Sequence, residues 1–95
     1  MLYNISMIIN GFIWDLENIQ HIARHQVAPS EAEEVLSSDC FVTKEREGRL
    51  GLLGVTSAGR FLIVIIERRD NDFYRPYTAY DMSIRQRDFY LSLLK

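Results

Sequence analysis

The sequence predicts an α+β fold in a single domain over residues 1–95, with an antiparallel sheet of four to five strands and three helices. Three observations lead to this prediction. An apolar, β-branched run over 61–66 is followed by a polar turn and a second strand-like segment over 73–80. Segments on both sides of this pair have the apolar spacing of helices. Turn residues recur at short intervals between residues 46 and 72, which leaves room only for short strands.

The chain opens with a predicted strand and helix. Residues 7–14 are mostly apolar, include aromatic rings and are interrupted by Gly11, which indicates a short strand. Asp15 takes the N-cap position of a helix that is predicted to run to about His25. Apolar residues recur along this helix at a spacing of three to four.

A second helix is predicted directly after Pro29. Ser30 is expected to open it, with Glu33 three residues later completing a capping box. The apolar face of this helix consists of Ala32, Val35 and Leu36. The chain therefore places two helices between its first strand and the rest of the sheet.

Four strands are then expected in an antiparallel meander, over 40–45, 49–56, 61–66 and 73–80. The third is apolar at nearly every position, which predicts a central strand buried on both faces. Glycines 48, 51, 54 and 59 are assigned to turns and strand kinks. Ser83 begins the last helix with Gln86 as its capping partner. Its predicted apolar face consists of Ile84, Leu91 and Leu94 and is widened by Phe89, Tyr90 and Leu93. The element order is β-α-α-β-β-β-β-α.

Composition narrows the protein class. The hydrophobic fraction of 47% is that of a folded globular protein. The single cysteine, Cys40, is predicted to be a buried structural thiol, and it fits a cytoplasmic location. No apolar run reaches the roughly 20 residues of a membrane span, and the start lacks the basic region of a signal peptide. Met1 and Met7 both remain possible start residues.

Charge is distributed unevenly along the chain. The net charge is −2, but residues 1–39 hold six acidic and one basic residue, whereas residues 40–95 hold seven acidic and ten basic ones. Arginine outnumbers lysine nine to two, and its planar fork of donors suits phosphate. A solvated charged surface is the alternative explanation of this pattern.

The residues with useful chemistry are arginines, tyrosines and histidines. The predicted last two strands and the turn before them contribute Arg60, Arg68, Arg75, Tyr77 and Tyr80. At the end of the first helix, Arg24 adds a hydrogen-bond donor for phosphate and His25 adds a general acid or base. His21 and His25 share a helical face with Glu17 and form an incomplete zinc ligand set, so no metal or cofactor is predicted and His21 is expected at the surface.

Short segments spread from Phe12 to Tyr90 resemble one known family. They are Phe12-Ile13-Trp14-Asp15, Asn18, Arg24-His25-Gln26-Val27, the helix over 30–35, Glu47-Gly48-Arg49, Gly54 with Gly59-Arg60, Glu67-Arg68, Arg75-Pro76-Tyr77-Thr78-Ala79 and Tyr90. In this order and spacing the chain resembles the BrnT family of small bacterial toxins from type II toxin–antitoxin modules. The family usually has glycine where this chain has Gln26, arginine where it has Tyr80 and glutamate where it has Gln86.

The resemblance implies a RelE-like ribonuclease fold that cleaves RNA without a metal ion and so inhibits translation. It implies Arg24, His25, Arg68 and Arg75 for the RNA site, with Arg60 as a weaker candidate. With the chemistry of the tyrosines added, we predict Arg68, Arg75, His25 and Tyr80 as catalytic residues and Arg24, Arg60 and Tyr77 as RNA-binding residues. It also implies a BrnA-like antitoxin with a ribbon-helix-helix domain, a hetero-oligomeric complex, and DNA binding only through that complex.

Two alternatives stay open. The second hypothesis is a non-catalytic RNA- or protein-binding module of the same fold, since Tyr80 and Gln86 replace family residues and the net charge is negative. A metal-dependent hydrolase that uses His21 and His25 is the third hypothesis.

Overall fold

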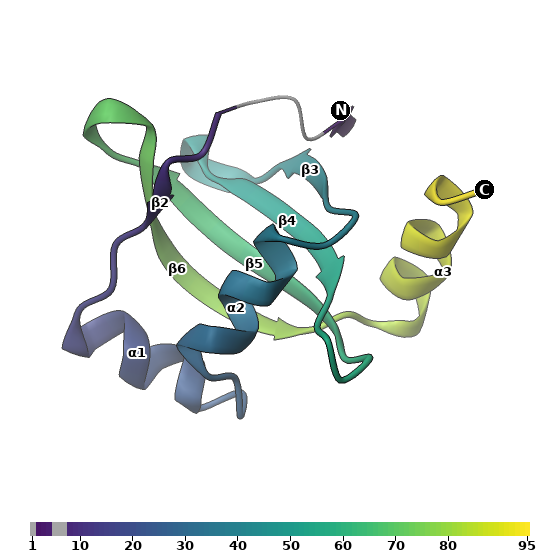
Figure 1. Ribbon diagram of the computed structural model, residues 1–95, viewed down its shortest axis with the longest axis horizontal. Helices are drawn as coiled ribbons and strands as arrows, with labels where there is room; N and C mark the ends of the chain where they lie inside the picture. The colour runs from purple at the N-terminus through teal and green to yellow at the C-terminus, as the bar shows by residue number, and fades with distance from the viewer. Residues whose placement is uncertain (1, 5–7) are drawn as a thin grey trace.

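The computed structural model describes residues 2–4 and 8–95 and places one six-stranded sheet beside three helices (Figure 1). The strands are β1 (Leu2–Asn4), β2 (Gly11–Phe12), β3 (Phe41–Lys44), β4 (Leu50–Val55), β5 (Phe61–Arg68) and β6 (Phe73–Asp81). The helices are α1 (Leu16–Ala23), α2 (Pro29–Leu36) and α3 (Ile84–Leu93). Short 3₁₀ turns, Arg46–Gly48 and Asp70–Asp72, join β3 to β4 and β5 to β6.

The sheet has the order β1-β3-β4-β5-β6-β2 and is antiparallel except where β2 pairs with β6. The predicted α+β class and four-strand meander are therefore confirmed. The strand predicted over 7–14 is shorter, because only Gly11 and Phe12 pair with β6; residue 7 lies outside the described residues. Strand β1, which pairs with β3, was not predicted.

Strand β5 lies at the centre of the molecule and is buried on both faces, as its apolar sequence predicts. Leu62, Val64 and Ile66 pack toward α1 and α2, which lie over one face of the sheet (Figure 1). Ile63 and Ile65 belong to a smaller cluster on the opposite face. We call this opposite face, which α1 and α2 leave uncovered, the open face.

Helix α2 begins one residue before the predicted start. Ala28 is its N-cap and Pro29 its first residue, where a proline with a fixed φ and no N–H is favoured. Glu31 accepts a hydrogen bond from the Ala28 N–H at 2.9 Å, so the predicted capping pair of Ser30 and Glu33 is wrong. The helix packs closely on β4, since a Cβ on Gly54 would lie 3.0 Å from Val35 Cγ1. Gly54 therefore allows a helix to approach the sheet rather than simply weakening the strand.

The start of α1 is fixed by Asn18, which is only 1% exposed. Its side chain and the Asp15 N-cap form the predicted cap, with each backbone N–H donating to the other side chain at 2.9 Å. Asn18 Nδ2 also donates to the carbonyls of Ile13 and Pro76, both at 3.0 Å. Pro76 belongs to the part of β6 that β2 does not cover, so Asn18 joins α1 to a free sheet edge.

The other end of α1 closes at Ala23, two residues earlier than predicted. Gln26 donates from its N–H to the Ala23 carbonyl at 3.0 Å, and Val27 to the Ile22 carbonyl at 3.1 Å, which is the Schellman pattern. Ile22 and Val27 are both buried, as this motif favours. Gln26 has φ of 56°, a left-handed conformation that costs little only for glycine.

Helix α3 differs most from its prediction. Ser83 and Gln86 form the expected capping box. The predicted apolar face is exposed, however: Ile84 is 80%, Leu91 39% and Leu94 45% accessible. Tyr90 alone is buried, and its hydroxyl donates to the Asp39 carbonyl at 2.7 Å. The helix follows the end of β6 (Figure 1), and Tyr90 anchors it to the sheet by packing with Leu53 and Ile63.

Cys40 is buried in the main core, as predicted. Burial raises the pKa of its thiol to about 12, which makes it an unreactive apolar group. None of the helices in the described part of the chain is long and apolar enough to cross a membrane.

Replacing Asn18 with alanine should lower the free energy of unfolding by about 3 kcal/mol, because the buried Pro76 carbonyl, the part-buried Ile13 carbonyl and the N-cap amide lose their partner. Chemical denaturation measures the change. Asn10→Ala is the matched control, since this exposed amide donates only to the Asn71 carbonyl. A loss below about 1 kcal/mol for Asn18→Ala would contradict this role.

Gln26→Gly should stabilise the protein by about 0.5–1 kcal/mol, because glycine adopts positive φ without a steric cost. Thermal unfolding beside Gln26→Ala separates this effect from loss of the side chain. Equal stability of the glycine and alanine variants would show that backbone strain at residue 26 is unimportant.

Candidate functional site

Four aromatic rings meet where α1 lies along the edge of β6. His21 lies 5.7 Å from Tyr77, His25 lies 5.9 Å from Tyr80, and the two histidines lie 6.4 Å apart, between ring centroids. We call these residues the ring cluster. The structure thus brings together three residues that the sequence predicted for the site, His25, Tyr77 and Tyr80. His21 is half-buried here rather than on the open surface.

Tyr77 reaches this position through an irregularity in β6. Ile65 pairs with Thr78 and Ile66 with Pro76, so Tyr77 is an extra residue in a β-bulge. Proline fits such a site because it cannot donate a ladder hydrogen bond. The bulge directs Tyr77 toward the open face beside Thr78, and a proline within the strand was the one sequence signal for it.

Arg49 is a site residue that the sequence analysis missed. Its guanidinium lies over the Tyr77 ring, 3.7 Å from the centroid, and its Nε donates to Glu67 at 2.8 Å. Burial is the largest single effect on the pKa of Glu67 and raises it, but the hydrogen bond from Arg49 and the nearby arginine charges together lower the pKa overall. The ion pair holds Arg49 flat against the ring. Arg49 directly precedes β4, and β5 separates that strand from β6, so no sequence spacing indicated the contact with Tyr77.

A hollow of about 290 Å³ opens on the open face beside Tyr77. Ile65, Thr78 and Tyr80 line it from the sheet, and Glu45 from the end of β3. Arg46, Glu47 and Arg49 also line it. Thr78 Oγ1 is fully buried here and has no hydrogen-bond partner among the described residues. We call this the tyrosine hollow.

Tyr77 also lines a second hollow, of about 240 Å³, on its α1 side. Arg75 reaches this hollow, but acidic residues already surround its guanidinium: Asp15 at 2.8 Å, Glu17 at 3.0 Å and Glu67 at 3.9 Å. The hydrogen bond from Arg75 holds the pKa of Asp15 below its usual range. Arg75 therefore joins the N-cap of α1 to β6.

Arg60 has the clearest structural role of the predicted RNA-binding residues. Its guanidinium donates to the carbonyls of His25 at 3.0 Å and Gln26 at 2.6 Å. It also pairs with Asp81 at 2.8 Å and with Glu31 at 3.2 Å. Because Asp81 directly follows Tyr80, Arg60 fixes the backbone on both sides of the His25–Tyr80 contact.

The remaining two predicted arginines lie apart from this network. Arg68 pairs with Asp72 at the β5–β6 turn and is 61% exposed. Its strand partner is Tyr74, six residues before Tyr80 and thus roughly 20 Å away along β6. Arg24 is exposed at the end of α1 and makes no ion pair within the described residues.

The ring cluster has the groups that proton transfer requires. An imidazole accepts or donates a proton near neutral pH, and His25 provides one beside the Tyr80 phenol. Burial, with a smaller effect of Glu45, raises the pKa of Tyr80 above its usual value. The phenol is therefore protonated at neutral pH and can donate a proton.

Metal ligands are not grouped in the described part of the chain. His21 and His25 are neighbours, but no set of three or more His, Cys, Asp or Glu residues could hold an ion there. The arrangement is one of rings and ion pairs.

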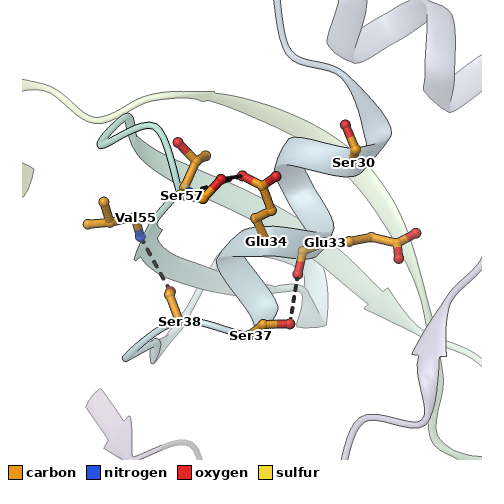
Figure 2. Close-up of a pocket in the computed structure, with 8 residues that line it drawn as sticks. Ser30, Glu33, Glu34, Ser37, Ser38, Val55 and Ser57 are labelled. Atoms are coloured by element: carbon orange, nitrogen blue, oxygen red, sulfur yellow. Dashed lines mark hydrogen bonds between the residues drawn. The ribbon is translucent and has the colours of Figure 1, made fainter.

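A third and larger hollow, of about 540 Å³, lies between α2 and the end of β4. Figure 2 shows its polar groups turned toward one another. Ser57 donates to Glu34, Ser37 to the Glu33 carbonyl, and Ser38 accepts from the Val55 N–H. Glu33 also accepts from the Trp14 indole. These groups serve packing of α2, and we assign no chemistry to this hollow.

Comparison with known proteins returns no match at any of three levels: family models, curated proteins and solved structures.

Proposed function

We propose that this protein is a metal-independent endoribonuclease, the toxin of a type II toxin–antitoxin module similar to BrnT. The observation that supports this most is the contact between His25, in the turn after α1, and Tyr80 of β6, whose ring centroids lie 5.9 Å apart. The element order also agrees with the α+β arrangement that the family resemblance implies.

The proposed reaction is an internal transfer at phosphorus. His25 removes the proton of a ribose 2′-hydroxyl, and the 2′-oxygen attacks the adjacent phosphorus. Tyr80 donates its proton to the 5′-oxygen as the P–O5′ bond breaks. The products are a 2′,3′-cyclic phosphate and a 5′-hydroxyl, so no other reactant is consumed.

The arginines take different parts in this proposal. Arg24 has no ion pair within the described residues and lies next to His25, so it is available to bind the scissile phosphate. Arg60 and Arg75 act as positioning residues, because their donors bind the backbone and carboxylates that hold α1 against β6. Tyr77 provides a ring on which a base can stack.

The same resemblance supports a BrnA-like, ribbon-helix-helix antitoxin as partner, with DNA bound only by the complex. A short adjacent gene that encodes such a protein would support the proposal. Growth rescue by its co-expression would test the pairing directly.

A non-catalytic RNA- or protein-binding module is the second candidate. The observation that favours it is that Arg49, Arg60, Arg68 and Arg75 all pair with carboxylates of the protein itself. Fewer cations then remain for the phosphates of a long RNA.

The deciding experiment expresses the chain alone in a bacterial host and follows growth, with RNA cleavage by purified protein measured in parallel. We expect growth arrest of the host, and RNA cleavage that persists when a metal chelator is added. His25→Ala and Tyr80→Phe should each reduce the cleavage rate about 10²–10⁴-fold, because each removes one proton-transfer group.

Arg85→Ala is the control, since this residue is exposed on α3. Arg68→Ala is tested as a separate variant. If this variant lost activity, the reaction would be assigned to the β5–β6 turn instead. Normal growth and intact RNA with the folded parent protein would favour the non-catalytic module.

A further inference from the structure

We propose that the tyrosine hollow binds one unstacked guanine base, which makes it the specificity site of the RNA that the protein recognises. This inference rests on the proposed action on RNA and names the base next to the reacting groups. Tyr80 lines the hollow and also contacts His25, so a base bound here would lie beside the proton-transfer pair.

The walls of the hollow suit a flat aromatic ligand. Tyr80 contributes a ring, Arg49 a guanidinium plane stacked on Tyr77, and Ile65 an apolar floor. Stacking on aromatic rings and guanidinium planes stabilises a splayed base. At about 290 Å³ the hollow is at the small end of ligand sites, which suits a nucleobase. Arg49 covers Tyr77 and prevents that ring from turning away.

Thr78 is the observation that points to a ligand. Its side chain is 9% exposed, its Oγ1 is fully buried, and no described group forms a hydrogen bond with that atom. A buried hydroxyl without a partner is costly, so such a group is retained where something else provides the bond. A small shift of the neighbouring rings would let Thr78 donate to a base carbonyl oxygen.

Glu45 gives the preference for guanine. Thr43 Oγ1 donates to its Oε2 at 2.8 Å, which holds the carboxylate at the rim. A carboxylate accepts two parallel hydrogen bonds. Among the four RNA bases only guanine presents two adjacent N–H donors, N1–H and N2–H, with a carbonyl oxygen next to them. Glu45 would accept from both donors while Thr78 donates to O6.

The test is a titration of the full chain, labelled with ¹⁵N, with GMP, AMP, CMP, UMP and inorganic phosphate. GMP should bind at least about tenfold more tightly than the other nucleotides and shift the amides of residues 77–80, whereas phosphate alone should not shift them. A short RNA with a single guanosine, compared with one lacking guanosine, distinguishes an RNA site from a site for free nucleotide. If the protein preferred GMP among the nucleotides but did not distinguish the two RNAs, the assignment of the hollow to RNA would be overturned.

Two variants test the contacts. Thr78→Val should weaken GMP binding about fivefold and raise the melting temperature by about 4–8 °C, because it removes the unpaired hydroxyl. Glu45→Gln should weaken GMP binding about tenfold and leave AMP binding unchanged. Asp88→Asn is the control, since this exposed carboxylate lies on α3 and does not line the hollow, so it should change GMP binding less than twofold.

Equal binding of the four nucleotides, or no effect of Thr78→Val and Glu45→Gln on GMP, would overturn the inference. GMP binding without RNA cleavage would uphold it and reject the ribonuclease. RNA cleavage without any base preference would uphold the ribonuclease and reject the guanine site.

Discussion

The buried amide of Asn18 is the contact on which the site depends. Its Nδ2 donates to the Ile13 carbonyl and to the Pro76 carbonyl, while its Oδ1 accepts from the N–H of Asp15, the N-cap residue of α1. An edge strand normally leaves its carbonyls to solvent or to another chain. Here one side chain provides a hydrogen bond to one edge carbonyl, that of Pro76, and attaches the start of α1 to the strand at the same time. The angle at which α1 passes β6, and therefore the meeting of two histidines with two tyrosines, follows from this bridge.

Two arginines further attach the α1 segment to β6 through ion pairs and hydrogen bonds. Arg75 ties the first turn of α1 to β6, and Arg60 ties the last turn to the end of β6. The family resemblance places both in an RNA site, but their donors bind protein groups. A guanidinium forms several directed hydrogen bonds at once, so it is as useful for joining elements as for binding phosphate. With these cations paired and a net charge of −2, recognition by this protein would depend on rings and hydrogen bonds more than on charge.

The bulge at Tyr77 places this ring between two hollows, one on the open face and one on its α1 side. On one side lie Arg75 and the acidic start of α1; on the other lies the Thr78 hydroxyl, which has no hydrogen-bond partner in the part of the chain that the structure describes. A strand without the bulge would pair Tyr77 in register and place its ring on the opposite face. The irregularity introduced next to Pro76 thus has a direct consequence for what the protein can bind.

The sequence by itself determined the element order, the central position of β5, the caps at Asp15 and Ser83, and the burial of Cys40, because each depends on local pattern or on apolar composition. It also selected His25, Tyr77 and Tyr80. Only the tertiary structure decided that Arg49 stacks on Tyr77, that Arg60 holds His25 in place, that Arg68 lies far from Tyr80, and that the apolar side of α3 stays exposed. Those outcomes depend on strand register, on a bulge and on which face each element presents. Such long-range geometry has no period along the chain, so residue spacing could not reveal it.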